Sequence, residues 1–335
     1  MTRFLARLGL SIGAVALVFM LAIALPARAQ QPSTVNPTAD AVNEQQLFKQ
    51  QQRIQGLISI PDTKESVLIQ PAGREWRFFH EVVLRWIGAI AVIGMVALLA
   101  VFYLLRGTIR IAAGRSGRKL LRFDVFERAV HWMTAVSFII LGLSGLNITY
   151  GKVLLLPLIG ATAFSDISVV LKYAHNYLSF PFTIGLVCIF FLWVRDNIPD
   201  RLDIQWLKQG GGIVGDKHPP ARRFNAGQKG VFWLVILAGV IMAISGYVLM
   251  FPFYGTGIAN MQSAQIFHAV VAVLFIAAML AHIYIGTLGM EGAFDAMGSG
   301  EVDVNWAKEH HKLWVEEEMG GRSALTPKPR MTAAE

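Results

Sequence analysis

The chain has 335 residues, of which 54% are hydrophobic and only 16% are charged. This composition is too apolar for a soluble globular domain and predicts an all-α integral membrane protein. The formal net charge is +8, but the basic residues flank apolar runs, which indicates membrane topology and argues against nucleic-acid binding. The single cysteine, Cys188, excludes covalent haem attachment and an iron–sulfur cluster held by this chain alone.

Residues 1–29 predict a secretory signal peptide. Arg3 and Arg7 precede an apolar run that ends at Leu25, and the Ala-Arg-Ala that follows has the spacing of a cleavage site. The run is slightly long for a signal peptide, so an uncleaved anchor stays open. In either case we expect residues 30–80 to form an extracytoplasmic polar segment, in which only the short QQLFKQQQRIQG stretch has helix-forming character.

Five further apolar runs predict membrane-spanning helices in the mature chain. The first makes residues 81–106 an extra transmembrane helix, and the other four form a core over residues 131–289. The approximate bounds of the five runs are Val82–Leu105, His131–Thr149, Tyr177–Val194, Val231–Met250 and Ile266–Leu288.

The distribution of basic residues predicts the orientation of these helices. Arginine and lysine concentrate in the loop 107–130 and again between residues 195 and 229, whereas the loops 150–172 and 251–267 carry few or none. By the positive-inside rule, the two basic loops lie in the cytoplasm. We therefore expect a multi-pass protein of the bacterial inner membrane, with its mature N-terminus periplasmic and residues 290–335 as a cytoplasmic tail.

The last predicted span contains two histidines, His268 and His282, that are fourteen residues apart. On an α-helix they lie on one face, about 40° apart in azimuth and about 21 Å apart along the axis. The predicted topology places His175 at the depth of His268 and His131 at the depth of His282. The sequence thus predicts an outer pair, His175 with His268, and an inner pair, His131 with His282.

Each pair supplies only two protein ligands, and the pairs are too far apart to share one zinc or di-iron centre. Haem iron, whose equatorial positions are already filled, suits two axial imidazoles. We therefore expect these four histidines to hold the iron of two haem b groups. A histidine at a membrane edge is by itself often an interfacial residue, and the pairing is what favours haem. Small residues would leave room for a macrocycle or serve ordinary helix contacts, namely Gly142, Ser144, Gly145 and Ser245-Gly246.

Four stretches carry a family resemblance: RFDVFERAVHWMTA, RFNAGQKGVFW, FHAVVAV with AHIYIGTL, and WAKEHHKLW. From about Arg122 to Glu318 the chain resembles the gamma subunit of membrane-bound respiratory formate dehydrogenase, a four-helix di-haem cytochrome b. The family's haem ligands fall on the four paired histidines. The extension before residue 107 goes beyond the short members of the family, and its role stays unassigned.

The resemblance implies a complex and a direction of electron flow. The partners would be an iron–sulfur beta subunit outside the membrane and a molybdenum or tungsten alpha subunit that oxidises formate. This chain, with no catalytic residue of its own, would pass electrons through two haems to a quinone (ubiquinone or menaquinone) at the cytoplasmic side and so contribute to proton motive force. A higher oligomer of that complex stays open.

The loop before the third core helix is the expected quinone site. Asn225, Gly227 and Gln228 lie at the cytoplasmic depth of His282, where amides can donate to a quinone carbonyl and glycine permits close approach. By resemblance, Asn225 matches the asparagine beside the family's quinone. The alternative is that Asn225 and Gly227 cap the next helix.

Two other functions stay open. A cytochrome b subunit of a nickel–iron hydrogenase would share the two haems but serve another donor, and the AGQK and HIYIG stretches favour formate dehydrogenase. A haem-free membrane anchor would leave the paired histidines unexplained. The remaining histidines are expected to be solvated or interfacial; they are His80, His218, His310 and His311.

Overall fold

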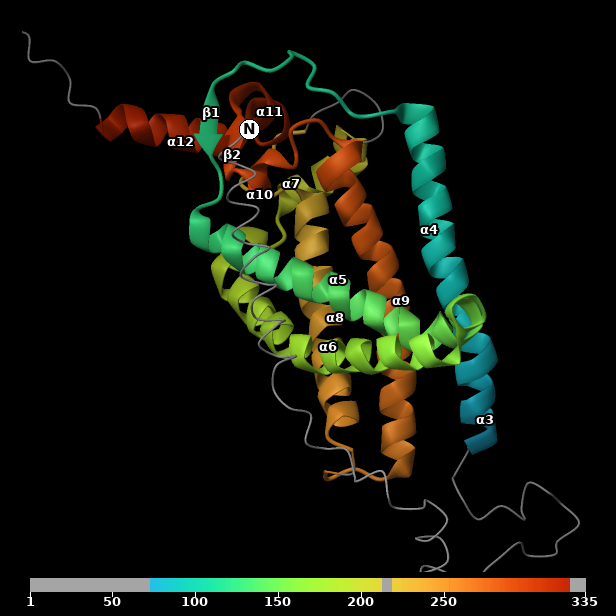
Figure 1. The fold of residues 1–335 in the computed structure, drawn as a ribbon. Helices are drawn as coiled ribbons and strands as arrows, with labels where there is room; N and C mark the ends of the chain where they lie inside the picture. Colours follow the sequence, from blue (N-terminus) through green and yellow to red (C-terminus); the bar gives the residue numbers. More distant parts are fainter. Residues whose placement is uncertain (1–72, 213–218, 253, 326–335) are drawn as a thin grey trace, which may run out of the picture. The chain divides into compact units, whose positions relative to one another are not determined.

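The computed structural model describes residues 73–212, 219–252 and 254–325, with side chains from residue 75 to residue 320 (Figure 1). The predicted signal peptide, the polar stretch up to residue 72 and His218 lie outside the described residues. Residues 71–335 belong to one compact unit.

Within the described residues, five helices are long and apolar enough to cross a membrane. The chain is therefore an all-helical, multi-pass membrane protein, as the composition predicts. The first crossing is built from α3 (Gly73–Phe78), the π-helix η1 (Phe79–Val83) and α4 (Leu84–Arg106). The others are α5 (Val125–Leu154), α6 (Leu156–Trp193), α8 (Ala226–Met250), and α9 (Ile258–Tyr284), which continues into the π-helix η4 (Ile285–Gly289).

The extra helix α4 packs beside α9, and most of its apolar side chains stay exposed (Figure 1). Only Leu84 and Gly88 are buried along it. Gly88 is needed there because an added Cβ would lie 2.3 Å from the hydroxyl of Tyr150. That hydroxyl donates to the carbonyl oxygen of Arg85 at 2.8 Å. Helix α4 thus presents a wide apolar surface of the kind that lipid covers.

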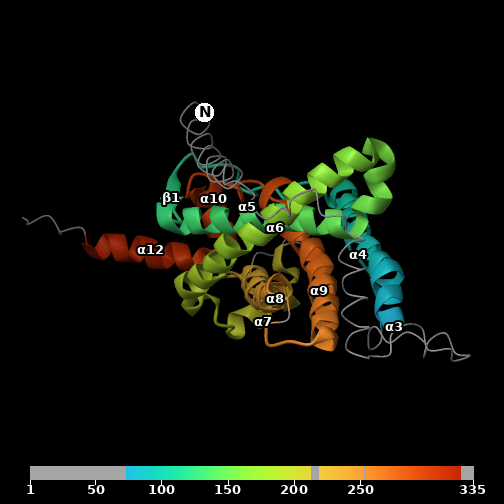
Figure 2. The same cartoon turned by 60° about the horizontal axis from the view of Figure 1, so that its bottom comes forward.

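Helices α5 and α6 lie side by side in both views (Figures 1 and 2). Helix α5 begins with a capping box between Asp124 and Glu127, which satisfies two backbone N–H groups that the first turn leaves free. The expectation of a loop over residues 150–172 is wrong, because α6 begins at Leu156. Its first turn is bent at Gly160 (φ 78°), and residues 161–172 contain no further glycine or proline to stop the helix.

A second helical pair, α8 and α9, packs against α6 through α8 and against α4 through α9. A short amphipathic helix, α7 (Arg201–Lys208), precedes α8 and carries its own capping box between Asp200 and Asp203. Two single 3₁₀ turns flank α7, at Arg195–Asn197 and Gly210–Gly212.

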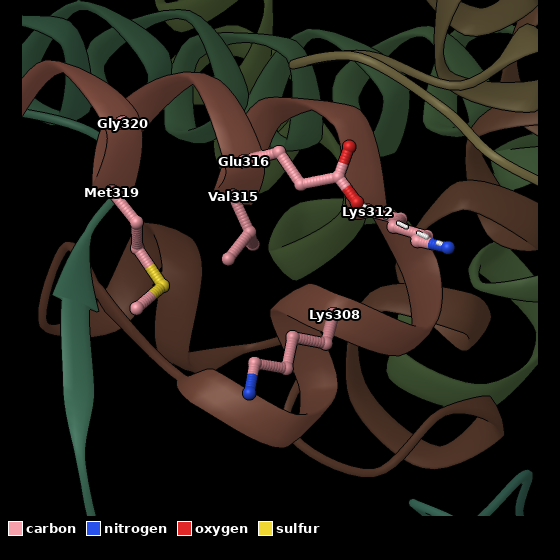
Figure 3. A pocket seen from close by; sticks show the side chains of 6 residues that line it. All are labelled: Lys308, Lys312, Val315, Glu316, Met319 and Gly320. Atoms are coloured by element: carbon pink, nitrogen blue, oxygen red, sulfur yellow. Dashed lines mark ion pairs between the residues drawn. The ribbon is translucent and has the colours of Figure 1, made fainter.

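The predicted cytoplasmic loop 107–130 and the tail fold together at the end where α8 begins and α9 finishes (Figure 1). Strand β1 (Lys119–Leu121) pairs antiparallel with β2 (Glu301–Asp303). The tail adds α10 (Asp295–Gly298), α11 (Val304–His310) and α12 (Lys312–Leu325). We call this group of elements the cap. Between α11 and α12 lies a groove of about 560 Å³, with Lys308 beneath Val315 and Met319 (Figure 3).

The cap is organised around a buried arginine. Arg122 is 4% exposed, and its guanidinium lies 5.1–5.5 Å from the ring centroids of Phe123, Trp306 and Trp314. Burial, and then the neighbouring Arg223 cation, lower the Arg122 pKa to about 9, so the side chain stays charged at neutral pH. Cation–π contacts of this kind are worth about 2 kcal/mol when desolvated.

The expectation that His310 and His311 are solvated is wrong. His310 is 8% exposed and His311 is fully buried against Trp306, and the His311 Nδ1 lies 2.8 Å from the carbonyl oxygen of Arg222. Burial, followed by the charge of Arg122, holds the pKa of His311 well below its usual range. Two adjacent histidines in a polar tail resemble a solvated turn, and only the aromatic residues on either side signal a core.

Candidate functional site

The structure brings the four predicted histidines together in the predicted pairs. The rings of His175 on α6 and His268 on α9 have centroids 6.1 Å apart and planes inclined by 68°. The rings of His131 on α5 and His282 on α9 have centroids 6.4 Å apart and an inclination of 58°. His131 and His175 lie within α5 and α6, not at the helix ends as the sequence suggested, because both helices begin earlier than expected.

This spacing fits two axial imidazoles on one haem iron. A metal–imidazole bond is about 2 Å long, and with about 1 Å from the nitrogen to the ring centre on each side, the two centroids lie about 6 Å apart. Across residues 73–212, 219–252 and 254–325, no group of three or more His, Cys, Asp or Glu side chains could hold a bare metal ion. Two-ligand sites of this kind suit a metal that brings its own equatorial ligands.

Two serine–glycine steps surround the His175–His268 pair. The Ser144 Oγ lies 2.8 Å from the Nδ1 of His175, and the Ser245 Oγ lies 2.9 Å from the Nδ1 of His268. The glycine that follows each serine faces the same ring: an added Cβ at Gly145 would lie 3.6 Å from the His175 Cε1, and one at Gly246 would lie 3.2 Å from the His268 Cε1. These small residues therefore make room for the imidazoles themselves.

The His131–His282 pair has different surroundings. The Nδ1 of His131 is buried and makes no hydrogen bond within the described structure. The His131 ring contacts the Trp132 ring edge-on at 5.4 Å, and the Trp132 indole donates to the carbonyl oxygen of Met297 at 2.8 Å. The cap therefore reaches the level of this pair through α10. The π-helix η4 begins three residues after His282, and single turns of π-helix are frequent at functional sites.

Asn225 and Gln228 form the capping box of α8. The Asn225 Oδ1 accepts from the Gln228 backbone N–H at 3.0 Å, and the Gln228 Oε1 accepts from the Asn225 backbone N–H at 3.1 Å. The capping alternative is thus observed, but it uses only the two oxygens and leaves both NH₂ groups as donors. Gly227 lies under Trp206 of α7, where an added Cβ would come within 3.0 Å of the indole.

A network of charges joins this loop to the His131–His282 end. Arg223 donates to the carboxylate of Glu127 at 2.6 Å, and the Trp193 indole donates to the same oxygen at 2.8 Å. Glu127 precedes His131 by one turn of α5 and so lies on the same face. Glu127 was not among the predicted site residues, although an acidic residue at the start of one apolar helix and a basic residue before another could have suggested the pair.

Lys229 is the second buried charge of the loop, with its side chain 7% exposed. Its ammonium lies 2.8 Å from Asp203 and 3.5 Å from Asp200, and it donates to the carbonyl oxygen of Ile198 at 3.1 Å. Burial raises the pKa of Asp200, but the Leu202 N–H and the Lys229 charge outweigh burial and lower it overall. Helix α7 is therefore tied to the first turn of α8.

Comparison with known proteins agrees with this geometry. The family model described as prokaryotic cytochrome b561 matches residues 122–300, just over half of the chain. The cytochrome b556(fdo) subunit of formate dehydrogenase from Escherichia coli K12 is 30% identical over 202 residues, which cover 59% of this chain and 92% of that protein.

Two other relatives align over a similar region. The nitrate-inducible formate dehydrogenase cytochrome b556(Fdn) subunit of the same organism is 26% identical over 205 residues, covering 60% of this chain and 92% of that protein. The formate dehydrogenase cytochrome b556 subunit of Haemophilus influenzae is 25% identical over 209 residues, covering 60% and 84%. With its helical core and paired histidines inside the matched region, the chain belongs to the prokaryotic cytochrome b561 family, whose members bind haem b.

Proposed function

We propose that this chain is the membrane cytochrome b subunit of a formate dehydrogenase, accepting electrons from an extracytoplasmic iron–sulfur subunit and delivering them to a quinone at the cytoplasmic side. The observation that carries the proposal is the pair of facing histidines at each end of α9, with ring centroids 6.1 and 6.4 Å apart. Formate as the ultimate donor rests on the relatives, which are named as formate dehydrogenase subunits. The partners of this chain would include a molybdenum or tungsten catalytic subunit.

The chain's own residues would hold two haem b groups. His175 and His268 would ligate the outer one, and His131 and His282 the inner one. When bound, each haem supplies a one-electron carrier. The apolar side chains between the pairs, among them Phe138 and Phe275 with centroids 4.7 Å apart, exclude water between them.

The proposed orientation follows from charge. The two basic loops and the tail gather at the end of the bundle that holds the His131–His282 pair, and the positive-inside rule favours a cytoplasmic location for that end. Quinone reduction there would draw protons from the cytoplasm while electrons arrive from outside, which contributes to proton motive force. Reporters fused after Arg118 and near Gly160 test this: the first should be cytoplasmic and the second periplasmic.

A quinone would bind beside the first turn of α8. The NH₂ groups of Asn225 and Gln228 remain as donors for its carbonyl oxygens, while their own oxygens hold the helix. Gly227 would contribute through its packing under Trp206, which fixes the loop. The ion pair between Arg223 and Glu127 would hold this loop near the face of His131.

Haem content tests the proposal. The purified protein should carry two haem b groups per chain that acidic organic solvent extracts, and dithionite should reduce both. A haem-free preparation would favour the membrane-anchor alternative. Co-purification of a molybdenum or tungsten formate-oxidising subunit is expected, whereas a nickel–iron subunit would make the chain the cytochrome b of a hydrogenase.

A further inference from the structure

The two histidine pairs differ in the residues that contact their rings. The dipeptides Ser144-Gly145 and Ser245-Gly246 both face the His175–His268 pair. In the other pair, the buried Nδ1 of His131 makes no hydrogen bond among the described residues. We propose that Ser144 and Ser245 are positioning residues that fix the ligands of the outer haem and lower its reduction potential below that of the inner haem. This inference rests on the proposed di-haem function.

The direction of the hydrogen bonds follows from the tautomer that a haem ligand needs. A neutral imidazole that gives its Nε2 lone pair to iron carries its proton on Nδ1, so the Nδ1–H of His175 and of His268 would donate to the neighbouring serine Oγ. The geometry of the serines is compatible with this role, because a hydroxyl has one proton and two acceptor lone pairs. Carbonyl oxygens stand ready to accept that proton, from Ile140 at 2.8 Å for Ser144 and from Ile241 at 2.7 Å for Ser245.

Gly246 leaves room for the His268 ring beside its serine. A Cβ at Gly246 would lie 3.2 Å from the His268 Cε1 and 3.7 Å from its Nδ1, so a larger residue would push the ring away from the serine.

Hydrogen bonding at Nδ1 changes the ligand electronically. A bound acceptor draws the Nδ1 proton outward, raises the basicity of the imidazole and makes Nε2 a stronger donor to the metal. Stronger donation stabilises ferric over ferrous iron, which lowers the reduction potential. Two such ligands act on the outer haem, whereas at least one ligand of the inner haem lacks this support. Electron transfer from the outer haem, with the lower reduction potential, to the inner haem, with the higher one, is therefore favourable.

Redox titration of the purified di-haem protein, followed by haem absorbance and by the low-spin ferric signals in electron paramagnetic resonance, tests the proposal. In the wild type the outer haem should be the lower-potential centre. His131→Ala, which removes the inner haem, identifies the transition that belongs to the outer one. A wild-type protein without two haems would overturn the proposed function itself.

The decisive variants are Ser144→Ala, Ser245→Ala and their combination. Each single variant should raise the midpoint of the outer haem, the double variant should raise it further, and the inner midpoint should not move. Both ligating histidines remain in each variant, so both haems should be retained. Ser144→Thr, which keeps a hydroxyl, should restore the wild-type midpoint.

A matched control is Ser263→Ala. Ser263 lies on α9, is exposed, and donates to the carbonyl oxygen of Ala259 at 3.0 Å, so its substitution removes the same kind of intrahelical bond without touching a histidine. It should leave both midpoints unchanged. If the Ser144 and Ser245 variants keep two haems with unaltered midpoints, or shift both midpoints equally, the positioning role is refuted while the di-haem function stands.

Discussion

The two ends of α9 hold their histidines in contrasting surroundings. At the His268 end, serine hydroxyls lie within hydrogen-bonding distance of the Nδ1 atoms of both imidazoles, and the Lys172 cation acts on both rings. At the other end, the segments that lead into α5 and α8 carry buried charges, each matched by a partner: Glu127 with Arg223, and Lys229 with Asp203. A site that only passes an electron gains from a dry and rigid pocket, whereas a site that also takes up protons needs polar groups and water nearby.

The cap is connected to the end of the bundle that holds His282. Arg122, inside the cap, donates to the carbonyl oxygen of Arg223, and Arg222 pairs with Glu317 of α12 at 2.7 Å. The tail is thereby linked to the loop that begins α8. Damage to the cap should consequently affect the His131–His282 end first.

Removing one histidine from each end gives the largest expected contrast. His268→Ala should eliminate the outer haem and block electron entry from the donor. His282→Ala should eliminate the inner haem but leave the outer one reducible by the donor. The measurement is haem content together with donor-driven reduction. Equal loss of both haems in both variants would show misfolding and break the comparison.

The next largest effect is expected at the charged end. Glu127→Gln removes the charge that pairs with Arg223, which keeps Asp196 as its other partner, and leaves a neutral amide oxygen as the acceptor for Arg223 and Trp193. Because Glu127 is buried while Arg223 is partly exposed, we expect a loss of about 2 kcal/mol in unfolding free energy. Thermal or denaturant unfolding of the purified protein measures it.

The control is Glu317→Gln, which breaks an ion pair whose two side chains are more than half exposed. It should change stability by less than about 0.5 kcal/mol. Similar losses in the two variants would mean that the network beside His131 is no more important than a surface pair.

A sharper variant separates capping from quinone binding. Asn225→Asp keeps an oxygen for the α8 cap but removes the NH₂ donor, whereas Asn225→Ala removes both and should cost about 1 kcal/mol of stability. Donor-driven haem reduction should stay fast in both variants, and reoxidation by quinone should slow about tenfold or more, as expected for one lost hydrogen bond to the substrate. Normal reoxidation in Asn225→Asp would move the quinone elsewhere.

The smallest effect concerns pH and the cap. The pKa of His311 is held well below 6.5 by burial and by Arg122, so the unfolded chain binds a proton that the folded cap rejects. Stability is therefore fully present above pH 6.5 and falls as the pH drops below it, by at most about 1.4 kcal/mol per pH unit. His311→Gln should flatten the change between pH 7 and pH 5 in unfolding experiments. If the dependence of stability on pH is unchanged in that variant, another group causes it.

Much of the candidate site could be predicted from the sequence because it depends on helical periodicity. The separation of His268 and His282 places both on one face of any helix that contains them. Basic loops then set the depth of His131 and His175. The predicted pairs are the pairs in the structure, and the apolar runs identify all five spans that the described residues contain.

The sequence alone determined the number of membrane-spanning helices among the described residues and the pairing of the histidines, since these follow from local apolar content and a fixed rise per residue. Only the tertiary structure decided which groups support those histidines and where the buried charges go. The hydrogen bond of Ser144 to His175 and the burial of His311 beside Arg122 join residues from different elements. Such contacts depend on side-chain directions and helix packing, which no periodicity within a single segment encodes.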